Sequence, residues 1–119
     1  MQSDLPVVSF KDVTALRRWL EVHHADPRGV LVRIYKKGSG VPSVAFEDVL
    51  DEGLCFGWSE SARFKGDGVS YLQKFAPRKT RGTTSERNRR HVERLSHEGR
   101  MTPMGFAALG INPRPPAPE

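Results

Sequence analysis

A group of basic side chains precedes a predicted helix in the segment APRKTRGTTS, residues 76–85. Arg78, Lys79 and Arg81 would lie near the first turn of that helix, which Ser85 is predicted to cap. The first turn of a helix has free backbone N–H groups, and with nearby cations these groups bind a phosphate or a carboxylate. The segment therefore indicates either an anion site or an exposed basic loop in front of a capped helix.

An aromatic side chain and a carboxylate stand two positions apart in the sequence Trp-Ser-Glu-Ser at residues 58–61. Because side chains alternate along a strand, Trp58 and Glu60 are predicted to share one face. If that face is partly buried, Glu60 needs a cation, and Arg78 is an available partner. The pattern favours a structural ion pair over a general acid or base.

Signatures of metal binding and nucleophilic catalysis are weak. His23 and His24 are adjacent on a predicted helix, so their side chains point about 100° apart and do not converge on a metal. Cys55 lies in an apolar run and is predicted to be a core residue rather than a reactive thiol. The loop at residues 36–40 lacks the full pattern of a phosphate-binding loop, although its lysines could reach an anion bound elsewhere. No metal, cofactor or catalytic residue is predicted, and the sequence leans against an enzyme.

These observations predict a non-catalytic binding module for a small anionic ligand or an acidic protein partner. The cations would neutralise the ligand, Trp58 would form a flat apolar wall, and Glu60 would orient Arg78. The predicted ligand-binding residues are Lys36, Trp58, Glu60, Arg78, Lys79, Ser85 and Asn88.

Nucleic-acid binding through the basic segment 74–94 is the alternative hypothesis. The net charge is +5, and residues 63–100 carry 11 Lys and Arg against 4 Asp and Glu, which indicates a face that meets anions or a solubilising face. Against nucleic acid, aromatic side chains that stack on bases are not interleaved in this segment. A steep fall of affinity with salt would distinguish it from a pocket. The candidate residues are Lys74, Arg78, Lys79, Arg81, Arg87, Arg90 and Arg94.

The elements that must position these residues follow from hydrophobic periodicity and turn signals. Helices are predicted at residues 11–23, 46–54, 85–98 and 103–109, and strands at residues 30–35, 58–64 and 69–75. Ser9 and Asp12 have the form of a capping box for the first helix. This order predicts an α+β fold in which a small antiparallel or mixed sheet of about three strands packs against three to four helices. The predicted core comprises Leu16, Leu20, Val32, Ile34, Phe46, Leu50, Leu54 and Trp58.

Length and composition set the domain organisation and the expected compartment. The 119 residues predict a single domain at residues 1–110 and a disordered proline-rich tail at residues 111–119. No run approaches the ~20 apolar residues of a membrane span. The N-terminal residues lack the pattern of a secretory signal. The lone cysteine fits a reducing compartment, so a cytoplasmic location is expected, while the oligomeric state is left open.

Several short segments, spread over roughly residues 10–109, carry a resemblance to a known family. They are the Trp19-Leu20 helix end, VRIYKKGSG (32–40), LCFGWSES (54–61), FAPRK (75–79), SERN (85–88) and EGRMTPMG (98–105). In their order and spacing the chain resembles the YdeI/OmpD-associated family of small bacterial proteins, often described as bacteriocin-protection proteins.

The resemblance implies a biological context without an established reaction. That context is a bacterial stress response with protection from bacteriocins or cationic antimicrobial peptides. The chain departs from the family pattern at Glu60, where the family usually has Asp, and at Thr84, where it usually has Trp. Because a basic protein repels cationic peptides, any protection is expected to be indirect.

Overall fold

Four strands form one mixed sheet in the computed structural model, which describes residues 5–79 and 85–111. The strands are β1 (Val7–Ser9), β2 (Val30–Tyr35), β3 (Trp58–Lys65) and β4 (Ser70–Pro77). The helices are α1 (Val13–His23), α2 (Phe46–Phe56), α3 (Glu86–His97) and α4 (Pro103–Leu109). The sheet order is β1-β2-β4-β3, with β1 parallel to β2 and the other pairs antiparallel. The fold is α+β, as predicted from the order of the elements.

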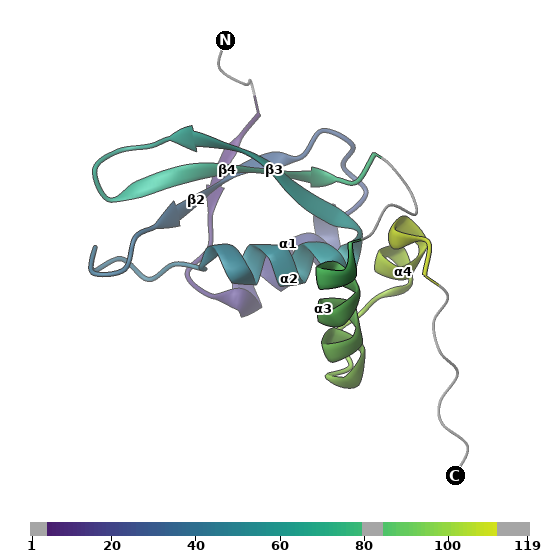
Figure 1. Cartoon of the computed structure of the whole chain (residues 1–119). Coiled ribbons are helices and arrows are strands. Elements are labelled where there is room, and N and C mark those ends of the chain that lie inside the picture. The colour runs from purple at the N-terminus through teal and green to yellow at the C-terminus, as the bar shows by residue number, and fades with distance from the viewer. Residues whose placement is uncertain (1–4, 80–84, 112–119) are drawn as a thin grey trace.

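The helices of the described chain lie on one side of the sheet (Figure 1). Helices α1 and α2 run beneath it, and α3 and α4 stand at one end of this helical layer. We call the sheet face that meets the helices the inner face and the opposite face the outer face. The outer face carries no helix in Figure 1, so its side chains are within reach of a partner.

Strand β1 is the element that the sequence prediction missed. It has three residues, too few to show an alternating pattern, and it forms by pairing in parallel with β2. Its presence also corrects the predicted start of the first helix. Ser9 belongs to β1, and Asp12 is the N-cap of α1, where its carboxylate accepts a hydrogen bond from the Ala15 N–H at 2.9 Å.

Capping residues that the sequence predicted lie at ends of the other helices. Ser85 caps α3 by accepting a hydrogen bond from the Asn88 N–H at 3.1 Å. Thr102 caps α4 in the same way, with Pro103 in the first turn. Gly57 ends α2 with a φ of +79°, a conformation that only glycine adopts readily. The helix therefore continues two residues beyond the predicted end at residue 54.

The core lies between the inner face and the helices, and it contains the predicted residues with one exception. Phe46 is only half-buried, because it lies at the rim, where the guanidinium of Arg63 covers its ring at 5.6 Å. Trp58 is 1% exposed and packs between Trp19 and Phe75, with ring centroids 5.6 and 5.0 Å away. Such aromatic packing fixes the start of β3 against α1.

We predict that Gly105→Ala destabilises the protein, although alanine normally stabilises a helix by about 1 kcal/mol relative to glycine. A Cβ atom at Gly105 would lie 2.5 Å from the Leu54 carbonyl oxygen and would also overlap that of Cys55. Separating α4 from α2 should cost about 2 kcal/mol or more in the free energy of unfolding, measured by urea denaturation.

The matched control is Gly68→Ala, because a Cβ atom there meets nothing within 4 Å. It should leave the free energy of unfolding within ~0.5 kcal/mol of the wild-type value. A stabilising effect of Gly105→Ala would show that α4 does not approach the end of α2 this closely.

Candidate functional site

The residues predicted to form one ligand pocket lie at opposite ends of the sheet. The Lys36 N–H donates to the Val69 carbonyl at 2.8 Å, beside the turn between β3 and β4. The Arg78 N–H donates to the Gly57 carbonyl at 2.9 Å, at the other end of β4. Strand β4 has eight residues and spans roughly 25 Å. The prediction that Lys36 shares a site with Arg78 is therefore wrong.

Trp58 does not form the predicted flat wall of a pocket. Its side chain points to the inner face, and its indole N–H donates to the His24 carbonyl at 2.9 Å. The period of two also places the half-buried Glu60 on that face, as predicted. Among the ion pairs of the described residues there is none between Glu60 and Arg78, so the predicted pair is absent.

The remaining predicted residues lie on either side of a segment that is not described. Lys79 is exposed just before residues 80–84, and Ser85 and Asn88 follow them at the start of α3. The Ser85 hydroxyl already accepts the Asn88 N–H. The predicted Arg81 and the family departure at Thr84 lie outside the described residues, as do residues 112–119 of the predicted tail.

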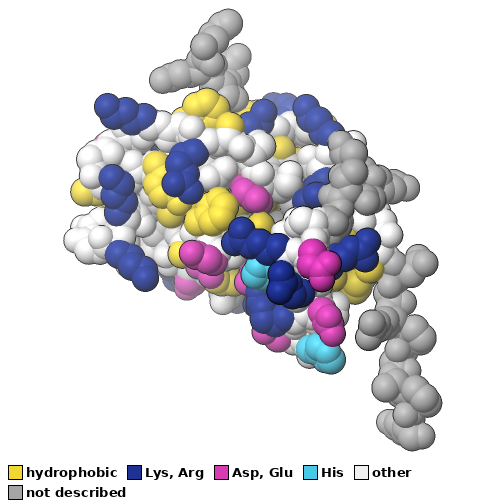
Figure 2. Space-filling view, viewed as in Figure 1, with side chains coloured by type: hydrophobic (Ala, Val, Ile, Leu, Met, Phe, Trp, Pro, Cys, Tyr) yellow, Lys and Arg dark blue, Asp and Glu magenta, His cyan; other side chains and the backbone are white. Residues whose placement is uncertain are grey.

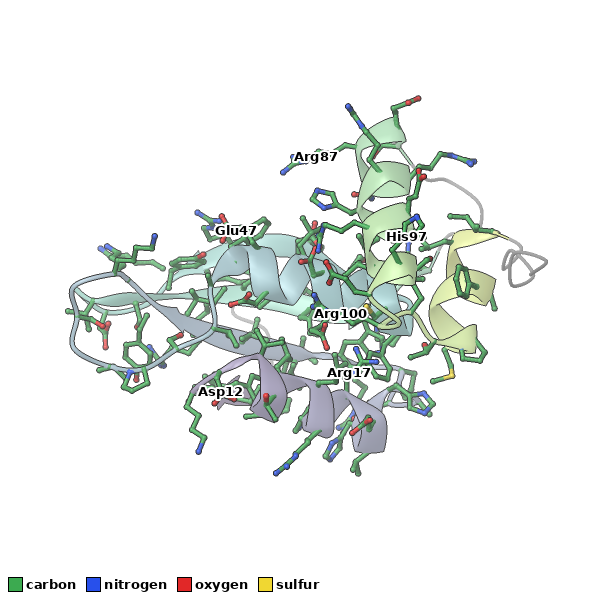
Figure 3. The ribbon with its side chains drawn as sticks, turned by 90° about the horizontal axis from the view of Figure 1, so that it is seen from below. Asp12, Arg17, Glu47, Arg87, His97 and Arg100 are labelled. Atoms are coloured by element: carbon green, nitrogen blue, oxygen red, sulfur yellow. The ribbon has the colours of Figure 1, made fainter. Side chains whose placement is uncertain are left out.

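The most buried charged group is a carboxylate that the sequence analysis did not identify. Glu52 of α2 is 0% exposed. Its Oε1 accepts a hydrogen bond from Arg17 Nη1 at 3.0 Å, and its Oε2 accepts one from Arg100 Nη2 at 2.6 Å. Arg17 Nη2 also donates to the Arg100 carbonyl at 2.8 Å. Figure 3 shows the labelled Arg17 and Arg100 converging from α1 and from the connection after α3.

Hydrogen bonds, charge and packing give this cluster a structural role. We call Glu52, Arg17 and Arg100 the clamp. Burial lowers the pKa of the Arg100 guanidinium, but its hydrogen bonds to Glu52 and Glu98 more than compensate and raise it. The Arg17 guanidinium carbon also lies 5.0 Å above the Phe56 ring. Each oxygen of Glu52 accepts a hydrogen bond from a guanidinium and the side chain is 0% exposed, so the carboxylate is not accessible to a substrate.

The sequence offered only a faint signal for the clamp. Glu52 lies in the buried part of α2, between Leu50 and Leu54, where an acidic residue requires a partner. Its partners are 35 and 48 residues away along the chain, so no local spacing identifies them.

Cys55 is buried, as its apolar surroundings predicted. Burial, with a further contribution from the charge of Glu52, raises the pKa of Cys55 to about 11. A thiol in this state has almost no thiolate near neutral pH, and thiolate is the reactive form. The part of the chain that the structure describes also contains no group of three or more metal-binding side chains and no helix that could cross a membrane.

Helix α3 carries several exposed cations. We define the basic α3 surface by the exposed side chains of Lys79, Arg87, Arg89 and Arg90. Figure 2 shows Lys and Arg side chains, interspersed with acidic ones, over this part of the molecule. Arg94 differs from them because it donates to the Asp51 carboxylate at 2.8 Å.

We predict that Glu52→Gln destabilises the protein by about 3 kcal/mol, because it removes the charge that two partly buried guanidinium groups share. The control is Asp51→Asn, which removes a carboxylate from a neighbouring, more exposed pair and should cost about 1 kcal/mol or less. Urea denaturation measures both values. Equal effects of the two substitutions would contradict a special role for the buried pair.

We also predict that Cys55 does not react with a thiol reagent in the native protein near neutral pH, because it is 0% exposed and its pKa is raised to about 11. After denaturation in guanidinium chloride it should react fully. Absorbance with a chromogenic disulfide reagent follows both reactions, and rapid labelling of the native protein would be inconsistent with the burial of this residue.

Comparison with known protein families gives a match that covers most of the described elements. A family model described as a domain of unknown function (DUF8412) matches residues 8–108, from within β1 to within α4. No curated protein and no solved structure matches the chain. The resemblance to the YdeI/OmpD-associated family stays a prediction. With its match over residues 8–108, the chain belongs to the DUF8412 family.

Proposed function

We propose that this protein is a non-catalytic binding module that docks an acidic protein partner through the basic α3 surface. The observation that supports the proposal is a difference between arginines of one helix. Arg94 is neutralised by Asp51 and Glu98. By contrast, no ion pair within the described residues involves Arg87 or Arg90. Their charges are therefore available to a partner.

The mixed charge of α3 favours a protein partner over a polyanion at this surface. Glu86 and Glu93 are exposed on the same helix as the arginines. A uniform row of phosphates would be repelled by these carboxylates, whereas a protein surface can place its charges in a matching pattern. Such a pattern fixes the orientation of the partner and speeds its association.

Of the two partners predicted from the sequence, a small anionic ligand or an acidic protein, the proposal keeps the acidic protein. The residues predicted for a small-ligand pocket do not converge, since Lys36 is remote and Trp58 is buried. A docking surface needs no pocket, and exposed charges of this kind are typical of the rim of a transient interface. In the context that the YdeI/OmpD resemblance implies, this interaction would belong to a cytoplasmic protective response in bacteria.

We predict that the double substitution Arg87→Glu with Arg90→Glu weakens binding of a fluorescein-labelled acidic peptide, in which glutamates are interspersed with lysines, at least tenfold at low salt. Both side chains are exposed, so the fold should tolerate the change. Glutamate at position 87 also lies in the first turn of α3, where a negative charge is favourable. Fluorescence anisotropy measures the affinity, and circular dichroism measures the melting temperature.

The matched control is Lys11→Glu with Arg18→Glu, which changes the net charge equally at exposed positions before and within α1. It should weaken binding by less than about threefold, through long-range charge alone. If both double variants lose affinity equally, the basic α3 surface is not the docking site.

A further inference from the structure

The outer face of the sheet presents apolar, aromatic and basic side chains that no helix covers. It is defined here by Val7 of β1, Arg33 and Tyr35 of β2, Phe64 of β3, and Leu72 and Lys74 of β4, whereas Leu31 of β2 on the same face is only 5% exposed. These residues alternate along their strands with residues of the core, and none of them belongs to the core cluster. The outer face is therefore an independent surface of the molecule.

The strand registers bring aromatic rings and cations together on this face. Leu72 pairs with Arg33 on one side and with Phe64 on the other. With neighbouring strands ~4.8 Å apart, the backbones of Arg33 and Phe64 are about 10 Å apart. Tyr35 follows Arg33 by two residues on β2, and Lys74 follows Leu72 by two residues on β4. Because these strands are antiparallel, Tyr35 and Lys74 lie on opposite sides of the Arg33–Leu72 pair. Two cations and two rings thus share the face, with Leu72 between Arg33 and Phe64.

This arrangement removes the objection to nucleic-acid binding that the sequence raised. Aromatic residues are not interleaved with the basic residues of segment 74–94. In the sheet, however, β2 and β3 place Tyr35 and Phe64 on the face that carries Lys74. Both rings are partly exposed, so part of each ring remains open to stacking.

Hydrogen bonds hold the central cation of the face in place. The Arg33 Nη1 donates to the Ser70 hydroxyl at 2.9 Å. The Asp67 carboxylate is 3.9 Å from Arg33 and accepts hydrogen bonds from the Ser70 hydroxyl and the Val69 N–H. Asp67 offsets part of the charge of Arg33, but a guanidinium has five N–H donors, so Arg33 keeps donors for a phosphate after its bond to Ser70.

We propose that the outer sheet face binds single-stranded nucleic acid, with bases stacked on Phe64 and Tyr35 and phosphates contacted by Arg33 and Lys74. A four-stranded sheet with aromatic side chains on its exposed face suits unstacked bases. A duplex hides its base faces and offers only phosphates to such a sheet. This inference concerns a different surface from the basic α3 surface, and the two are tested separately.

The test measures binding of fluorescein-labelled oligouridine and oligothymidine to the full chain by anisotropy, as a function of salt. Phe64→Leu keeps most of the apolar volume but removes the ring, and it should weaken binding about tenfold. Lys74→Gln should reduce the slope of log affinity against log salt by about 0.7, the value for one lost phosphate contact with a single strand. A lysine with a merely structural role would not change this slope.

The control is Arg89→Gln on the basic α3 surface, which should leave both the affinity and the salt slope close to the wild-type values. Oligouridine and oligothymidine differ at the 2′-hydroxyl and at the C5 methyl group of the base, so oligodeoxyuridine is measured beside them to show whether the sheet distinguishes RNA from DNA. Circular dichroism establishes that each variant is folded, and Tyr35→Leu replaces Phe64→Leu if the latter does not fold.

Three results would overturn the proposal. They are the absence of binding at low salt, equal affinity for a duplex of the same length, and equal weakening by Arg89→Gln and the ring substitutions. The double substitution Arg87→Glu with Arg90→Glu should weaken binding of the acidic peptide at least tenfold while leaving oligonucleotide binding within about threefold of wild type. Failure of the peptide experiment alone would therefore not count against the sheet, and the converse also holds.

Discussion

The arrangement of the helices depends on the burial of one carboxylate. A charged group removed from water needs compensating partners, and Glu52 is completely buried. It has two partners, Arg17 from α1 and Arg100 from the connection between α3 and α4. Because Arg17 also bonds the Arg100 carbonyl, the guanidinium groups satisfy Glu52 only when α1, α2 and that connection are all in place. We infer that the cluster selects this packing from others that would bury the same apolar area.

A second constraint acts at the end of α2, one turn beyond the clamp. The Thr102 N–H and hydroxyl both donate to the carbonyl of Cys55. Gly105 lies so close to this point that no side chain fits between α4 and α2. Together with the clamp, this contact fixes both ends of the segment that follows α3. The exposed side of α3 is therefore presented at a defined angle, which a docking surface of separate charges requires.

Sequence reasoning predicted the local features and missed those that depend on distant contacts. The bounds of β2 and the caps Ser85 and Thr102 follow from propensity and hydrogen bonding within a few residues, and these predictions are confirmed. Strand β1 needs β2 as a partner, so three residues alone could not reveal it. Lys36 and Arg78 are near the ends of different strands, and only the sheet register shows that β4 separates them. The same register places Phe64 and Lys74 on one face of the sheet. Because they come from different strands, no short stretch of sequence showed a binding surface there.

The fold neutralises part of the uneven charge distribution seen in the sequence. Residues 63–100 carry an excess of Lys and Arg, and residues 1–62 carry a small excess of Asp and Glu. Part of this excess is internal to the fold, because Asp51 and Glu52 of α2 neutralise Arg94 and Arg100. Arg87, Arg89 and Arg90 lie on α3, where carboxylates are interspersed, and Lys74 lies on the outer sheet face among apolar and aromatic side chains. The proposed α3 surface would select a partner by the pattern of its charges, and the proposed sheet surface would select one by base stacking, so the two proposed sites would not compete for the same partner.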